Sequence, residues 1–189
     1  MLDAGIIWNV VDQPTLLAVL GVTVVLAWPL GRLLGHGALG VLFVVVLGAV
    51  LAATTTTELP YYSVGGIELY LREFAHPTDL VAGFASGDER LANVGLFLPL
   101  GSVATLLWRR PVTVFCACAA LSFAVEGWQG FIGRGGDAVD VVHNAFGAFL
   151  GVGVGCIALI AQRRPGRPGG RTARARSGSS PGICARQPD

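Results

Sequence analysis

The stretch that decides the fold runs from Ser122 to Gly151 and reads SFAVEGWQGFIGRGGDAVDVVHNAFGAFLG. It places a glutamate, a glutamine, an arginine, two aspartates, a histidine and an asparagine inside and between two apolar runs. An ionisable side chain near the centre of a membrane span costs about 2.5–3.5 kcal/mol or more, so such a residue indicates a functional site with a partner. Glu126 is that residue here, and we interpret the rest of the chain as its support.

The composition of the chain is that of a membrane protein. Of 189 residues, 53% are hydrophobic and 13% are charged, whereas soluble domains average about 25% charged residues. All 13 basic residues are arginine, and the formal net charge of +1 carries no signal for a nucleic-acid partner. We therefore expect membrane lipids, and no nucleic acid, among its partners.

Three of the four cysteines lie in apolar runs, and no histidine or acid stands near them at metal-ligand spacing. These three, Cys116, Cys118 and Cys156, are interpreted as small buried hydrophobic residues. The sequence accordingly predicts no metal site, no cofactor and no pattern of disulfides.

The apolar runs predict five membrane spans, because a helix of about 20 residues crosses a hydrocarbon core about 30 Å thick. The predicted spans are residues 15–34, 38–54, 91–108, 111–128 and 139–161. They form an all-α, multi-pass transmembrane helical bundle over residues 15–161. An extracytoplasmic N-terminus (1–14) precedes this bundle, and a disordered, basic cytoplasmic tail (162–189) follows it.

The arginines near the span ends predict the orientation, because basic loops are retained on the cytoplasmic side. With five spans, one side of the membrane carries Arg32, Arg109, Arg110 and the arginines after residue 162. The opposite side carries the acidic N-terminus and the acidic connection over residues 54–90. The N-terminus is therefore predicted outside and the C-terminus inside.

The long connection contains one amphipathic segment, GIELYLREFA. Its spacing places Ile67, Tyr70 and Phe74 on one face of a helix, and Glu68 and Arg72 can pair on the other. This pattern predicts a short helix that lies on the membrane surface or caps the bundle. A packed loop helix and a lid over a ligand site are both open.

Two polar stripes are expected to face each other across the fourth and fifth spans. Ser122, Glu126 and Gln129 share one helical face, and Asp140 and Asn144 share another with Gly147 and Gly151. The connection between them is short and rich in glycine, which makes the two helices antiparallel neighbours. Arg134 lies in it and is the natural partner of Glu126, Asp137 or Asp140.

A buried carboxylate must be paired or protonated, and two interpretations of the polar residues follow. They form either a closed network that pins the helices together, or the lining of an outward-facing pocket that an amphiphilic ligand enters from the outer leaflet. We favour the pocket. If the protein is an enzyme, which stays open, Glu126 is the acid or base candidate, with Asp140 and His143 as alternatives. A Ser122–His143–Asp140 triad and a Glu126–Asp140–His143 metal site have weaker motif support.

Three blocks of sequence stand out: N-V-G-L-F-L-P-L-G from Asn93 to Gly101, S-x-x-x-E-x-x-Q from Ser122, and R-x-x-D-x-x-D-x-x-x-N-x-x-G-x-x-x-G from Arg134. Together they resemble the VanZ-like family of bacterial membrane proteins. The resemblance covers about residues 90–155. It implies a multi-pass helical protein of the bacterial cytoplasmic membrane, in a family whose named member is associated with resistance to the lipoglycopeptide teicoplanin.

The function expected from these observations is the binding of an amphiphilic or lipid-linked cell-envelope molecule, such as a cell-wall precursor or a lipoglycopeptide. An intramembrane hydrolase or transferase and a purely structural helix clamp are the alternatives. The predicted ligand-binding residues are Asn93, Ser122, Glu126, Gln129, Arg134, Asp137, Asp140 and Asn144.

Overall fold

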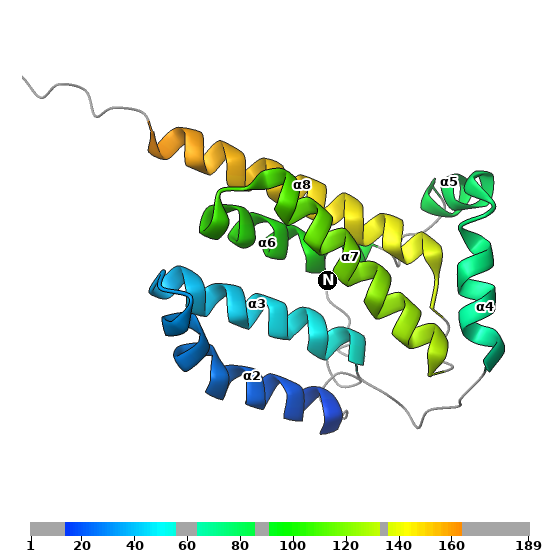
Figure 1. Cartoon of the computed structure of the whole chain (residues 1–189), viewed down its shortest axis with the longest axis horizontal. Coiled ribbons are helices and arrows are strands. Elements are labelled where there is room, and N and C mark those ends of the chain that lie inside the picture. Colours follow the sequence, from blue (N-terminus) through cyan, green and yellow to red (C-terminus); the bar gives the residue numbers. More distant parts are fainter. Residues whose placement is uncertain (1–13, 56–63, 86–90, 133–135, 164–189) are drawn as a thin grey trace, which may run out of the picture.

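The computed structural model describes residues 14–55, 64–85, 91–132 and 136–163, and these residues form seven α-helices and no strand (Figure 1). The helices are α2 (Pro14–Leu33), α3 (Ala38–Thr55), α4 (Val64–Glu73), α5 (Pro77–Ala85), α6 (Leu91–Trp108), α7 (Pro111–Phe131) and α8 (Ala138–Gln162). The predicted all-α class is thereby confirmed. Arg134, the N-terminal segment before Pro14 and the basic tail after Arg163 lie outside the described residues.

Four of these helices, α2, α6, α7 and α8, are long and apolar enough to cross a membrane. The stretch Ala38–Thr54 of α3 is also apolar but is shorter than these four helices. A multi-pass membrane protein is the class that these helices support. The fifth span and the orientation of the termini stay predictions.

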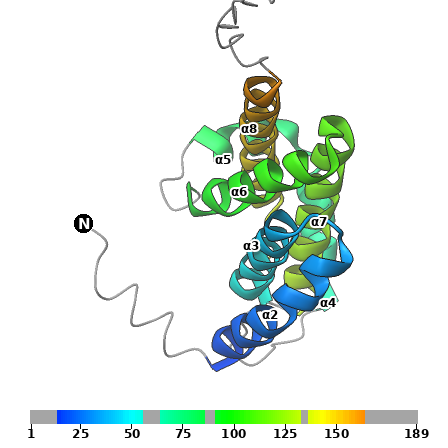
Figure 2. The same ribbon diagram turned by 90° about the vertical axis from the view of Figure 1, so that its left-hand side faces the viewer.

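The long helices run back and forth between two ends of the molecule, and their apolar core lies between α3, α6, α7 and α8 (Figures 1 and 2). At one end α7 finishes and α8 begins, and the short helices α4 and α5 pack against them there. At the other end α2 turns into α3, α6 turns into α7, and α8 finishes. The core cluster contains Val50, Phe97, Leu100, Ala104, Val114, Cys118 and Ala148.

The glycines of α8 pack against α6, which corrects the expectation that their stripe faces α7. A Cβ atom on Gly151 would collide with the backbone of Leu98 and lie 3.0 Å from the nitrogen of Ser102. In the reverse direction, a Cβ on Gly101 would lie 2.6 Å from the carbonyl oxygen of Ala148. Small residues permit such close approach of two helices in a membrane. The asparagine of the same stripe faces α7, so α8 contacts its two neighbours with different residues.

Candidate functional site

The start of α8 is held by carboxylates from three parts of the chain. The backbone N–H of Asp137 donates to Glu126 Oε2 on α7 at 3.3 Å, and that of Ala138 donates to Glu73 Oε2 on α4 at 2.8 Å. The N–H of Val139 donates to Oδ1 of Asp137, the N-cap residue, at 2.7 Å. The first N–H groups of a helix lack partners inside the helix and carry partial positive charge, so these carboxylates both satisfy and stabilise the start of α8.

Glu126 occupies the buried side of this arrangement, where its side chain is only 3% exposed. The approach of the chain to Glu126 depends on Gly136, because a Cβ atom there would collide with the carbonyl oxygen of Glu126 and lie 2.8 Å from the nitrogen of Gly130. The glycine-rich connection therefore brings the N-terminus of α8 directly against the end of α7. This contact fixes the Glu126 carboxylate between the two helices.

One turn deeper in the bundle, Ser122 and Asn144 join α7 to α8. The Asn144 Nδ2 donates to Ser122 Oγ at 3.0 Å, and the two residues are 2% and 0% exposed, respectively. Within the described part of the chain, the side-chain oxygen of Asn144 has no hydrogen-bond partner. An unmet acceptor inside an apolar bundle is costly, which distinguishes this pair from the apolar core around it.

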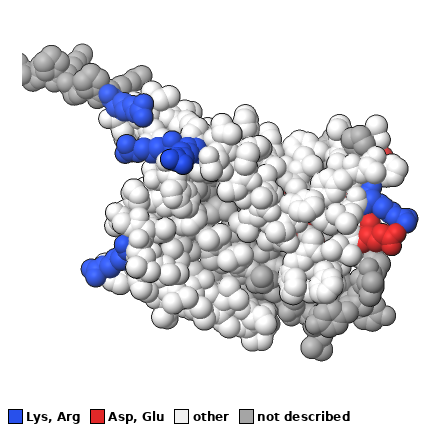
Figure 3. Space-filling view, in the orientation of Figure 1, with Lys and Arg blue, Asp and Glu red and all other residues white. Residues whose placement is uncertain are grey.

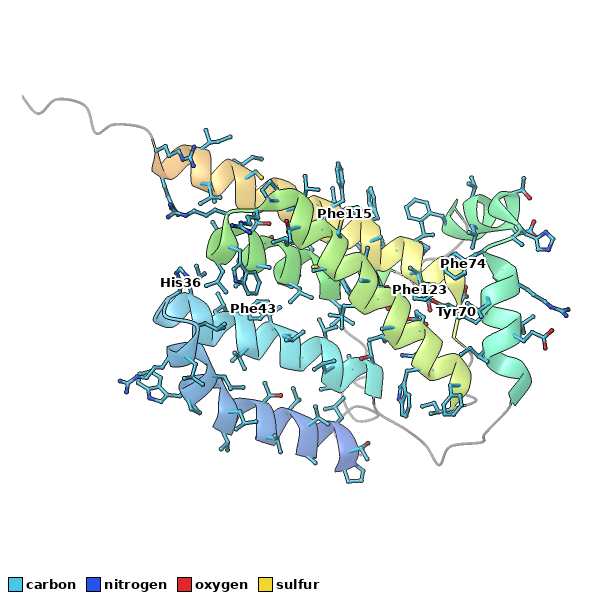
Figure 4. The ribbon with its side chains drawn as sticks, viewed as in Figure 1. His36, Phe43, Tyr70, Phe74, Phe115 and Phe123 are labelled. Carbon is cyan, nitrogen blue, oxygen red and sulfur yellow. The ribbon has the colours of Figure 1, made fainter. Side chains whose placement is uncertain are left out.

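Helix α4 contributes a second side chain, Tyr70, which is buried against α7. Its hydroxyl donates to the carbonyl oxygen of Phe123 at 3.0 Å, and its ring lies 5.3 Å and 5.5 Å from the rings of Phe74 and Phe123 (Figure 4). Burial, with the nearby negative charges of Glu126 and Glu73, raises the pKa of Tyr70 well above its ordinary value. Tyr70 is therefore a neutral donor that anchors α4 over the carboxylates.

A hollow of about 410 Å³ opens beside these carboxylates, between α4, α5 and the start of α8. Such a volume falls in the range of about 300–1,000 Å³ that is usual for small-molecule sites. Its lining combines both charges with apolar side chains. The lining residues are Leu69, Arg72, Glu73, His76, Asp79, Leu80, Asp137 and Val139.

The buried His143 contacts the backbone of its own helix and a ring of α5. Its Nδ1 lies 2.9 Å from the carbonyl oxygen of Val139, which can only accept, so Nδ1 carries the proton. Its ring stacks on Phe84 of α5 with 4.5 Å between the centroids. The hydroxyl of Ser122 pairs with Asn144. In the part of the chain that the structure describes, Ser122 and His143 therefore have different hydrogen-bond partners, Asn144 and Val139.

A family model described as VanZ/LLP1 matches residues 41–160, which is more than half of the chain. The chain belongs to the VanZ/LLP1 family. The matched region extends beyond the motif-bearing residues 90–155 toward the N-terminus, so it includes α4 with Tyr70 and Glu73. No curated protein and no solved structure matches the chain.

The predicted site residues of this VanZ/LLP1 chain fall into three groups. Ser122, Glu126, Asp137 and Asn144 come together at the contact of α7 with α8, and Asp140 lies in the first turn of α8 beside them. Gln129 instead donates to the carbonyl oxygen of Thr54 at 3.1 Å and ties α7 to α3.

The two remaining predicted residues are Asn93 and Arg134. Asn93 lies near the start of α6, half-buried, and forms no hydrogen bond within the described residues. Arg134 lies outside the residues that the structure describes. Over the described ranges, no three His, Cys, Asp or Glu side chains come close enough together to hold a metal ion.

The sequence prediction did not include Glu73 and Tyr70, which the structure places beside the predicted candidate residues. Tyr70 was assigned only to the apolar face of a short helix, and Glu73 only to an acidic loop. The amphipathic pattern of GIELYLREFA carried the available signal, because a helix that caps the bundle must place residues from its inner face over the span ends. The sequence does not predict which span ends this short helix covers, because that depends on the tertiary structure.

Proposed function

We propose that this VanZ/LLP1 protein binds an amphiphilic cell-envelope molecule in the hollow between α4, α5 and the start of α8. The head group of the ligand occupies the hollow, and its lipid tail leaves toward the bilayer. The observation that carries the proposal is the pairing of a hollow of about 410 Å³ with half-buried carboxylates, Glu73 and Asp137, in its wall. The inner carboxylate Glu126 holds the start of α8, and so keeps that wall in place.

The charges of the lining favour a head group with both hydrogen-bond donors and acceptors. Arg72 and His76 can donate, whereas Glu73, Asp79 and Asp137 are acceptors when ionised. A bare phosphate would face three carboxylates, so like-charge repulsion opposes it. A sugar or peptide head group with hydroxyl, amide and amine groups complements this mixture, as in lipid-linked wall precursors and lipoglycopeptides.

The apolar part of the ligand has a route along the same helices. Leu80 and Val139 line the hollow, and Leu69 beside them is 62% exposed. Val81, also on α5, is 71% exposed. Exposed apolar side chains beside a polar hollow are expected where a protein meets lipid at a membrane interface.

The distribution of charge supports placing the hollow on the outer side of a bacterial cytoplasmic membrane. The described acidic residues belong to α4, α5, the end of α7 and the start of α8. On the face in Figure 3, arginines gather at the opposite end of the molecule. Basic residues are retained on the cytoplasmic side, so the hollow faces outward. The hollow is then accessible to wall precursors and lipoglycopeptides, as teicoplanin resistance by this family would require.

Purified full-length protein in lipid nanodiscs tests the proposal with two probes, teicoplanin and an undecaprenyl-linked wall precursor. We expect saturable binding of at least one probe, and binding at least about tenfold weaker in Asp79→Asn, because a lost charged hydrogen bond contributes about 1.5–3 kcal/mol. Glu68→Gln is the matched control, since Glu68 is an exposed acid on α4 outside the hollow. Equal binding by Asp79→Asn and the wild type would refute the site.

The same samples separate binding from catalysis. Mass spectrometry of the probes after incubation is expected to find them unchanged. Conversion of the wall precursor to a product would instead favour the alternative function, an intramembrane hydrolase or transferase that uses Glu126 or Asp140.

A further inference from the structure

A second cavity lies at the opposite end of the bundle, enclosed by α3, α6 and α7. Its volume is about 380 Å³, and its lining is apolar except for Arg110 and Thr113. Phe43 of α3, labelled in Figure 4, and Trp108 of α6 both line the cavity. Their rings lie edge to face with the centroids 4.7 Å apart. Ala104, Ala117 and Leu121 contribute to the remaining surface. Among the described residues that line it, Arg110 is the one cationic group of this otherwise mostly apolar cavity.

The cationic group stands where the chain reverses between two helices. Arg109 has a positive φ of 55°, a conformation that non-glycine residues seldom adopt, and Pro111 begins α7 directly after Arg110. The reversal thus takes only two residues, and both are exposed arginines. Neither guanidinium forms an ion pair with any described residue.

Within the described ranges, no acidic residue lies at this end of the molecule. Each acidic residue that the structure describes belongs to α4, α5, the end of α7 or the start of α8, at the far end. Arg32 lies at the basic end too, but it stacks over the Trp28 ring at 4.5 Å and does not line the cavity. An anionic ligand would therefore complement the arginines beside the cavity, which have no acidic partner among the described residues.

We propose that this cavity binds an anionic phospholipid, with one acyl chain along Phe43, Trp108 and Leu121 and the phosphate at Arg110. An acyl chain matches the apolar lining, because burial of each methylene group is favourable. The phosphate matches the arginine, whose planar fork of donors is suited to phosphate. The site is separate from the proposed envelope-ligand hollow, so either can fail without the other.

Full-length protein in a non-ionic detergent, studied by native mass spectrometry, tests this site. The probes are phosphatidylglycerol and phosphatidylcholine with the same oleoyl chains. We expect the wild type to bind phosphatidylglycerol about fivefold more tightly, and Arg110→Gln to lose that preference. Arg32→Gln is the matched control, and it should keep the preference.

A second variant tests the apolar part of the site. Ala117→Trp places an indole in the cavity and should weaken the binding of both phospholipids, whereas Arg110→Gln should weaken only that of phosphatidylglycerol. Unchanged phosphatidylglycerol binding in either variant would overturn the proposal. Tighter binding of free oleate than of phosphatidylglycerol would overturn it as well, because the cavity would then select a fatty acid.

Discussion

The carboxylate of Glu73 accepts the backbone N–H of Ala138 at 2.8 Å, across 65 residues of sequence. This bond joins a short helix of the long connection to the first turn of α8, which the family motif residues flank. Helix α4 is therefore attached to the bundle, and its residues line one side of the hollow. The start of α8 therefore depends on α4 for one of its capping contacts.

The first prediction concerns this bond. Glu73→Ala removes an acceptor from the start of α8 and should lower the free energy of unfolding by about 0.5–2 kcal/mol, as other lost helix caps do. Thermal unfolding of the protein in detergent measures the effect. Glu68→Ala is the control, because its exposed ion pair with Arg72 contributes about 0–1 kcal/mol. Equal stability of the two variants would remove the capping role of Glu73.

The second prediction is that Glu126 stabilises the start of α8 through its hydrogen bond rather than through its negative charge. Glu126→Gln keeps an oxygen that can accept the N–H of Asp137, whereas Glu126→Ala leaves that partner unmet. The alanine variant should lose about 1–3 kcal/mol of stability and the glutamine variant clearly less. Unfolding curves of the two proteins in the same detergent compare them directly. A glutamine variant as unstable as the alanine variant would show that the negative charge itself is required.

The glycines of α8 provide a matched pair of substitutions. Gly151→Ala would drive a Cβ into the backbone of Leu98 and push α8 away from α6, whereas Gly153 has open space around it. We expect Gly151→Ala to be destabilising by about 1–3 kcal/mol, in line with other overpacked sites. Gly153→Ala should be neutral or slightly stabilising, because alanine is the better helix former. Thermal unfolding distinguishes the two, and equal effects would refute the α6–α8 contact.

Tyr70 predicts a dependence of stability on alkaline pH. Burial and the charges of Glu126 and Glu73 raise its pKa in the folded state, whereas an unfolded tyrosine titrates near pH 10. The folded protein therefore keeps a proton that the unfolded chain releases, and the stability from Tyr70 is present below about pH 10 and lost as the pH rises further. Unfolding measured at pH 8 and at pH 10.5 should show a larger loss in the wild type than in Tyr70→Phe. Identical losses would mean that the phenol is not protected.

Much of the helical framework could be predicted from the sequence, because apolar runs of sufficient length leave few alternatives in a membrane. The run at residues 91–108 is the helix α6 of the structure, and the antiparallel contact of α7 with α8 follows from their short connection. The pairing of Ser122 with Asn144 was similarly accessible, because the helical period placed each on a polar face.

What the sequence could not predict depends on the positions of helices relative to one another. Gly147, Asn144 and Gly151 have compatible spacings for one stripe, yet the glycines pack against α6 while Asn144 faces α7. Helix α8 contacts both α6 and α7, and the helical period alone does not predict which of its residues face which of these two helices. Glu73 was missed for the same reason, since no local pattern links it to Ala138.

Site-specific photo-cross-linking in bacterial membranes tests the central claim, that the hollow holds an envelope amphiphile. A photoreactive phenylalanine analogue would replace Leu80, which lines the hollow, or its neighbour Val81, which is 71% exposed and does not. We predict that mass spectrometry finds an adduct with a lipid-linked glycan or peptide at position 80, and only bulk phospholipid at position 81. Bulk phospholipid alone at both positions would contradict the account.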